Sequence, residues 1–317
     1  KNPKYNGNNL LDIKENQFNR NESIDKNTWA FKVYRQHTRV INDYYWAYVP
    51  MVEQTKYKKR QETQKMTVPI FFNASGPDVR RLAPTLDKWE ESIISFSNWN
   101  RINVLVTMCS NFETYLAAVT KIALESNPIV ILGMTHQNDG LVFLKNEFFN
   151  NKRYRGLVDD ITEGITRGDW QSRSNVFYSI FSDAPEILKI SISDLEKMRN
   201  MRNKAAHSFG RDIEESRKNR TLDLLRADKL TEKKMQHFFN ITYRIAQSID
   251  EYMLNKHIGS YEALYFYHEQ YVKKYKLTGY DGEIMIKVKK DLTAMNGLEN
   301  WSKKYVEEMI KYYHEKI

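Results

Sequence analysis

Hydrophobic side chains recur every three or four residues over several long stretches of the chain, the period of an α-helix with one buried face. The clearest stretch has apolar residues at Val104 or Leu105, Met108, Phe112, Leu116, Val119 and Ala123. It predicts a helix over residues 102–126 that stops before Pro128. The same period predicts further helices over residues 170–182, 231–255, 260–276 and 298–315.

Other stretches have a weaker pattern. Residues 1–28 hold eight Asn and few large apolar side chains, so we expect an irregular polar arm. Residues 29–66 fit either strands or an amphipathic helix, and the pattern does not decide between them. Residues 127–168 predict an insertion with one or two short elements, and Asp281-Gly282 favours a short hairpin over residues 280–288.

The composition supports a mainly α fold. Gly contributes 12 and Pro 7 of the 317 residues, below the usual ~7% and ~5%. A many-stranded sandwich needs a turn every ~8–12 residues, and a chain this poor in turn residues does not supply them. We therefore expect a helical bundle.

Length, cysteine content and charge limit the compartment and the partners. The longest apolar run, residues 128–134, is far shorter than the ~20 residues of a membrane span, and the polar start shows no signal-peptide pattern. Cys109 is the single cysteine, which excludes an intramolecular disulfide and fits a reducing compartment. We expect a cytoplasmic protein. The net charge of +9 favours an anionic partner, nucleic acid above all, although a generally basic composition would give the same value.

The segment 193–210 carries the most specific pattern. Ser193 and Glu196 have the spacing of a capping box, and Gly210 is a typical helix stop, so we expect a helix over residues 194–209. At ~100° per residue, one apolar stripe contains Leu195, Met198, Ala205, Ala206 and Phe209. Arg202 falls inside this stripe, and Arg199, Asn203 and His207 form a polar ridge along one edge.

An Arg inside an apolar stripe needs a partner carboxylate or a polar cleft, because a guanidinium stays charged. The imidazole of His207 is suited to moving a proton near neutral pH. Arg202 and His207 could therefore carry out metal-free RNA transesterification, with Asn203 binding a phosphate or holding the imidazole. The alternative is that Arg202 pairs with a buried acid and His207 is a surface histidine.

Positive charge concentrates around this helix. Residues 197–220 hold eight basic residues against three acidic ones, which is more than half of the net charge of the chain. The basic residues are Lys197, Arg199, Arg202, Lys204, Arg211, Arg217, Lys218 and Arg220. A polyanion such as RNA would bind there; the alternative is a basic loop without a ligand.

The run Arg202-Asn203-Lys204-Ala205-Ala206-His207 resembles the Arg-x(4–6)-His signature of the HEPN superfamily, including a polar residue after the Arg. The segment Ser110-Asn111-Phe112-Glu113-Thr114-Tyr115-Leu116 resembles the early long helix of those bundles. The resemblance covers about residues 86–258, and the insertion at 127–168 departs from a compact bundle.

This resemblance implies a metal-independent endoribonuclease of the defence or toxin type, whose active site forms across a homodimer. Arg202 and His207 would be catalytic with Asn203 beside them, and Arg199, Lys204 and Glu113 would be auxiliary. Glu113 would act as an orienting acid; the alternative is an ordinary Glu on the helix surface. Arg211, Arg217, Lys218 and Arg220 would contact RNA. A regulatory or antitoxin partner would fit such a protein. The alternative is a non-catalytic helical module that binds RNA, a nucleotide or a protein.

We expect three regions: an N-terminal accessory region (1–85), the HEPN-like bundle (86–258) and a basic, aromatic helical extension (259–317). Seven aromatic residues at 261–280, interleaved with lysines, could stack on bases or form a packed helix face. The sequence holds no His-Glu-x-x-His motif, Cys/His cluster or phosphate-binding glycine loop, so we expect neither a metal nor a cofactor.

Overall fold

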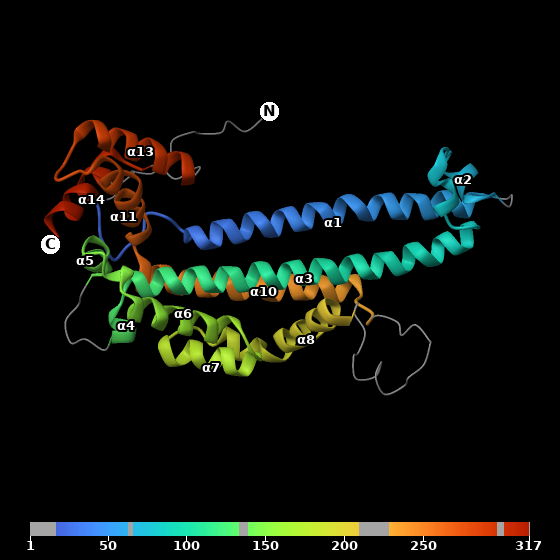
Figure 1. Cartoon of the computed structure of the whole chain (residues 1–317), viewed down its shortest axis with the longest axis horizontal. Coiled ribbons are helices and arrows are strands. Elements are labelled where there is room, and N and C mark those ends of the chain that lie inside the picture. The colour runs from blue at the N-terminus through green and yellow to red at the C-terminus, as the bar shows by residue number, and fades with distance from the viewer. Residues whose placement is uncertain (1–16, 63–65, 133–138, 209–227, 297–300, 317) are drawn as a thin grey trace, which may run out of the picture.

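The computed structural model describes residues 17–62, 66–132, 139–208, 228–296 and 301–316, without the side chains of residues 206–208 and 296. This part of the chain is mainly helical and holds no strand, which confirms the predicted fold class. None of its helices is long and apolar enough to cross a membrane. The molecule is elongated: helices α1 (Trp29–Gln61), α3 (Leu86–Ser126) and α10 (Glu232–Met253) run along its long axis (Figure 1).

Residues 29–61 form one helix, so the helical alternative for this stretch is the correct one. The Thr28 side chain caps α1 by accepting a hydrogen bond from the Phe31 N–H. Phe31, Tyr34, Tyr45 and Val52 are buried and fall on one face of the helix. Through this face α1 packs along α3, and the short elements α2 (Val68–Phe71) and η1 (Pro77–Arg81) join the two helices.

Helix α3 begins at Leu86, well before the expected residue 102. Thr85 caps it by accepting from the Lys88 N–H. No residue between Leu86 and Ile102 is buried, so this first part carries no continuous apolar stripe by which it could be recognised. A hydrogen bond between Tyr48 Oη and Ser97 Oγ (2.8 Å) ties it to α1.

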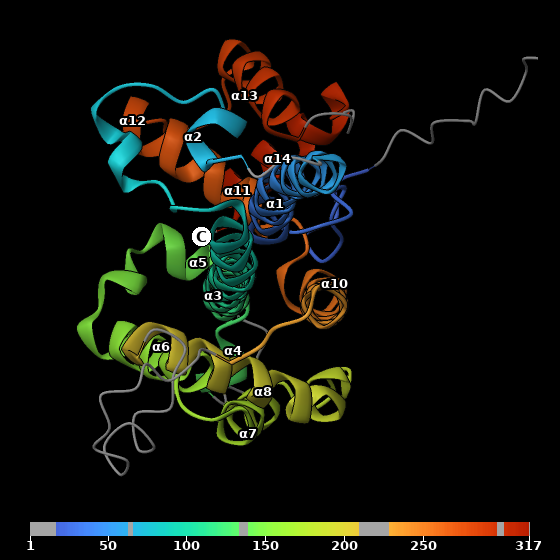
Figure 2. The ribbon, with the colours of Figure 1, turned by 90° about the vertical axis from the view of Figure 1, so that its right-hand side faces the viewer.

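The segment after α3 contains α4 (Ile129–Leu132), α5 (Gly140–Lys145), η2 (Phe148–Asn150), α6 (Lys152–Thr166), α7 (Trp170–Ile180) and α8 (Ile187–Ser208). Of these, α6, α7 and α8 form a second layer beneath the long helices, seen end-on in Figure 2. The described part of residues 127–168 thus holds four elements, among them the 15-residue α6, and the expectation of one or two short elements is wrong. Helix α8 begins seven residues before the expected residue 194. Ser193 therefore lies inside the helix, where its neighbours' N–H groups are already bonded, and the predicted capping box is wrong.

The C-terminal part packs against the far end of α3. It contains the π-helical turn η3 (Leu254–Ile258), α11 (Tyr261–Tyr267), η4 (His268–Val272), α12 (Lys273–Tyr275), α13 (Gly282–Asn296) and α14 (Lys303–Glu315). The hairpin expected at 280–288 is wrong, because Asp281 Oδ1 accepts from the Glu283 and Ile284 N–H groups and starts α13 instead. Tyr261, Tyr267 and Tyr271 are buried, which favours the packed-face interpretation of the aromatic stretch.

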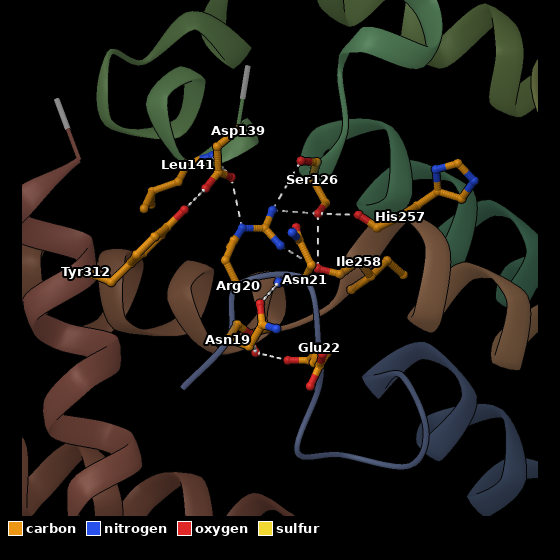
Figure 3. Close-up of polar contacts among 11 residues, drawn as sticks. Asn19, Arg20, Asn21, Glu22, Ser126, Asp139, Leu141, His257, Ile258 and Tyr312 are labelled. Atoms are coloured by element: carbon orange, nitrogen blue, oxygen red, sulfur yellow. Dashed lines mark hydrogen bonds and ion pairs between the residues drawn. The ribbon is translucent and has the colours of Figure 1, made fainter. Parts of the chain in front are cut away.

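Residues 17–28 are irregular, as expected, but they are fixed to the body through Arg20 (Figure 3). Arg20 Nε donates to Asp139 Oδ1 (2.9 Å), Nη1 to the Ile258 carbonyl (2.8 Å) and Nη2 to Ser126 Oγ (2.9 Å). Tyr312 Oη donates to the second Asp139 oxygen (2.6 Å). Arg20 thus joins the ends of α3, α5 and η3, and Asp139 brings in α14.

One continuous core cluster contains Phe31, Leu116 and Tyr305, one from each of the three expected regions. The division at residues 85 and 258 stays a prediction.

Candidate functional site

Helices α3, α7 and α8 meet at the carboxylate of Glu113. Arg173 Nη1, on α7, donates to Glu113 Oε1 (2.9 Å). Arg202 Nη1, on α8, donates to Glu113 Oε2 (3.1 Å), and Nη2 donates to Oε1 (3.3 Å). The structure therefore brings together two residues that the sequence singled out separately, Glu113 and Arg202, and adds Arg173.

Arg173 is held in place on every side. Its side chain is only 3% exposed, and Nε donates to the Gly168 carbonyl (3.0 Å). Its guanidinium carbon lies 4.5 Å from the centre of the Trp170 ring, a cation–π distance. Trp170 in turn stacks on Phe112, with ring centres 5.8 Å apart. These contacts fix Arg173 and, through it, one oxygen of Glu113.

Arg202 is less enclosed, because a quarter of its side chain (25%) is exposed. Its Nε is buried and has no hydrogen-bond partner among the described residues. A guanidinium carries five N–H donors, and two nitrogens of Arg202 are used by Glu113. Arg202 therefore keeps donors beyond those that its ion pair occupies.

The cluster of Glu113, Arg173 and Arg202 carries a net positive charge, since one carboxylate faces two guanidiniums. Arg173 is enclosed, so the excess charge reaches the surface at Arg202. A partly exposed, unneutralised guanidinium is suited to binding an anion. Arg202 does pair with an acid, Glu113, as the alternative interpretation expected. Because Glu113 also pairs with Arg173, one positive charge of the cluster stays unbalanced.

The small space behind Arg202 does not admit a substrate. It measures about 10 Å³, the minimum for a single water molecule. Cys109, on its wall, is buried, and burial raises the pKa of its thiol to about 12. The thiol stays protonated and is no nucleophile near neutral pH. A ligand of Arg202 has to approach from the exposed side.

Arg199 lies next to this cluster in an ion pair of its own. Its Nε donates to Glu196 Oε1 (2.9 Å), and the guanidinium lowers the pKa of the Glu196 carboxyl. Glu196 Oε2 also accepts from the Trp170 N–H (3.2 Å), which ties α8 to the first residue of α7. Glu196 thus caps α7 rather than its own helix.

The other predicted site residues lie further along α8 or beyond it. Asn203 is half-buried, and Lys204 Nζ lies 3.3 Å from Asp228 Oδ2. His207 belongs to the last turn of α8, but its side chain lies outside the described part of the chain. The predicted RNA contacts Arg211, Arg217, Lys218 and Arg220 also lie outside the described residues.

Sequence reasoning missed Arg173, although a signal was present. Arg173 follows Trp170 by three residues and precedes Phe177 by four, so it sits on the apolar face of its helix. The same signal, an Arg within an apolar stripe, singled out Arg202.

The chain matches no protein-family model, and comparisons with curated proteins and with solved structures gave no match either.

Proposed function

We propose that this protein is a metal-independent endoribonuclease that cleaves RNA by attack of a ribose 2′-OH on the adjacent phosphate. The observation that carries the proposal is the excess positive charge of the Glu113 cluster at Arg202, on the helix that also carries His207. The spacing of these two residues, which resembles the HEPN signature, supports the same chemistry.

In the proposed reaction the 2′-oxygen forms a bond to phosphorus while the bond from phosphorus to the 5′-oxygen breaks. An imidazole accepts the proton of the 2′-OH, and a second, protonated imidazole gives a proton to the leaving 5′-oxygen. His207 of each subunit would supply these two groups if the active site spans a homodimer, as the resemblance implies. The products are a 2′,3′-cyclic phosphate and a 5′-OH.

Arg202 would stabilise the charge that builds up on the phosphate oxygens in the transition state. Glu113 would orient Arg202, and Arg173 would orient Glu113. Asn203 would bind a phosphate or hold His207. Lys204 and Arg199 would stay auxiliary, because Asp228 and Glu196 balance their charges. A role in antiphage defence or as a toxin, with a regulatory partner, follows from the resemblance alone.

The test is cleavage of tRNA and mRNA by the purified protein in EDTA, with the product ends identified by mass spectrometry. Loss of the general acid–base His207 in His207→Ala should lower the rate about 10²- to 10⁴-fold. Arg202→Lys should also be impaired, because lysine does not reproduce the planar guanidinium. Lys189→Ala, which removes a half-exposed cation from the same helix, is the matched control and should cleave normally.

Two results would refute the proposal: no cleavage by the wild-type protein, or equal cleavage by His207→Ala. The dimer is tested separately by sedimentation. A strictly monomeric protein with full activity would contradict a composite site.

The second candidate is a non-catalytic helical module that binds RNA, a nucleotide or a protein. The two hydrogen bonds from Arg202 to Glu113 favour this candidate. Such an ion pair is enough to explain why an Arg lies in an apolar stripe, without any catalytic role. Binding of RNA without cleavage, unchanged in His207→Ala, would select this candidate.

A further inference from the structure

A groove of about 1040 Å³ lies between α1, α10 and the end of α13, away from the Glu113 cluster. Its lining on α1 includes Lys32, Arg35, Arg39, Asn42 and Trp46, at alternating steps of three and four residues. These side chains therefore form one stripe along the helix. From Lys32 to Trp46 the stripe is ~21 Å long at ~1.5 Å per residue.

The groove is basic. It contains Lys32, Arg35 and Arg39, and none of its described lining residues is acidic. Lys32 pairs with the buried Asp25 (3.0 Å), so its charge is balanced locally. Arg35 and Arg39 are exposed, and neither forms an ion pair within the part of the chain that the structure describes. These two guanidiniums provide the positive charge along the open side of the groove.

Aromatic rings and amides accompany the charges. The indole of Trp46 is 41% exposed, which is unusual for a side chain of this size. Phe239 and Tyr243 of α10 contribute half-buried rings to the opposite wall. The lining also contains the amides of Asn27, Gln36, Asn42, Gln236 and Asn240.

We propose that this groove binds a single strand of RNA, with Arg35 and Arg39 on its phosphates and Trp46 stacked on a base. Cations along the backbone path, with rings that stack on any base, are the usual means of binding single-stranded nucleic acid. Amides can reach the base edges that an unpaired strand exposes. The length of the stripe suits about four nucleotides, the lower end of known site sizes.

The choice of RNA over DNA rests on the proposed ribonuclease function. Helix α10 connects the two regions, because it packs against both α1 and α8. The groove would thus hold part of a substrate strand while Arg202 and His207 act on another part.

Binding is tested with a fluorescent 2′-O-methyl oligonucleotide, which lacks the attacking 2′-OH and stays intact whether or not the protein cleaves RNA. The variant Arg35→Gln/Arg39→Gln removes two exposed charges. Each lost phosphate contact lowers the slope of log affinity against log salt by ~0.7. For two contacts, the ratio of wild-type to variant affinity should therefore be about 25-fold larger at ~0.1 M than at ~1 M salt. Trp46→Ala should weaken binding about 5- to 150-fold, the range for one stacked base.

The matched control is Lys58→Gln/Arg60→Gln, which removes two exposed charges from the same helix outside the groove. It should bind nearly as the wild type does. Equal binding by all variants, or equal loss in the groove and control variants, would overturn the proposal. So would complete displacement of the oligonucleotide by a poly-glutamate peptide at equal concentration, since the groove would then be an acidic-peptide site. Failure of the ribonuclease proposal is distinguishable, because it would leave binding in the groove intact and abolish only cleavage.

Discussion

Glu113 binds two guanidiniums that differ in burial, and this difference predicts which of them the fold requires. Arg173 is 3% exposed and Arg202 is 25% exposed. We compare Arg173→Gln with Arg202→Gln. If Arg202 serves a ligand rather than the fold, its loss should cost much less stability than the loss of Arg173.

The magnitudes follow from the contacts. Arg173→Gln removes the buried partner of Glu113, the bond to the Gly168 carbonyl and the contact with Trp170. Removing one partner of a buried ion pair lowers the free energy of unfolding by at least about 3 kcal/mol. We use this lower value because Glu113 keeps Arg202 as a second partner in Arg173→Gln. Arg202→Gln leaves a neutral Glu113–Arg173 pair, and the partly exposed ion pair that it removes contributes about 1 kcal/mol. The expected difference is about 2 kcal/mol.

The assay is equilibrium urea unfolding followed by circular dichroism. With an unfolding entropy of ~2.1 cal/mol/K per residue, the same difference corresponds to ~3 °C in melting temperature for 317 residues. Lys189→Gln on α8 is the control and should stay within ~0.5 kcal/mol of the wild type. Equal destabilisation by Arg202→Gln and Arg173→Gln would show instead that the fold requires both guanidiniums.

Two further predictions concern the contacts that hold residues 17–28 and the start of α1. Glu262 is buried against the Trp29 N–H, and burial raises the pKa of its carboxyl to about 8. Since this value lies above the ordinary one, the free energy of unfolding should fall as pH rises from ~4.5 to ~8, by up to ~1.4 kcal/mol per pH unit. Glu262→Gln should remove this fall in urea titrations at pH 5 and 8, and parallel pH profiles for the two proteins would contradict the assignment. Gly259→Ala should destabilise the protein by about 2 kcal/mol or more and expose residues 17–28 to proteolysis, because φ is +54° and the new Cβ would lie 2.5 Å from the Arg20 carbonyl oxygen. Gly156→Ala, with open space around its Cβ, is the control, and equal protease resistance of both variants would disprove the argument.

The sequence predicts a helix well where burial is continuous along one face. Met108, Phe112 and Leu116 are all buried, and the helix that they predict is present. Its first part was missed because no residue between Leu86 and Ile102 is buried. The prediction from Asp281-Gly282 was wrong for another reason: the same dipeptide favours both a tight turn and a helix start. Burial of Ile284, Met285, Val288 and Leu292 on one face of α13 decides for the helix.

Contacts between distant segments explain what sequence patterns could not give. The partners of Arg20 are more than 100 residues away along the chain, so residues 17–28 read as an arm. At the site, a stripe position identified Arg202 and a family resemblance identified Glu113, but nothing local indicated that they meet. They are 89 residues apart in the sequence, and the packing of α3 on α8 brings them together.

The meeting of three residues rather than two changes the electrostatics of Arg202. In an isolated pair, the field of Glu113 would largely cancel that of the guanidinium, and an approaching phosphate would displace the carboxylate or be repelled by it. Arg173 already balances Glu113 from the buried side. The carboxylate can therefore fix the orientation of Arg202 by two hydrogen bonds while the net charge beneath the surface stays positive. A phosphate at Arg202 would meet a guanidinium that is preoriented and still unneutralised, which is the arrangement that stabilises charge developing in a transition state.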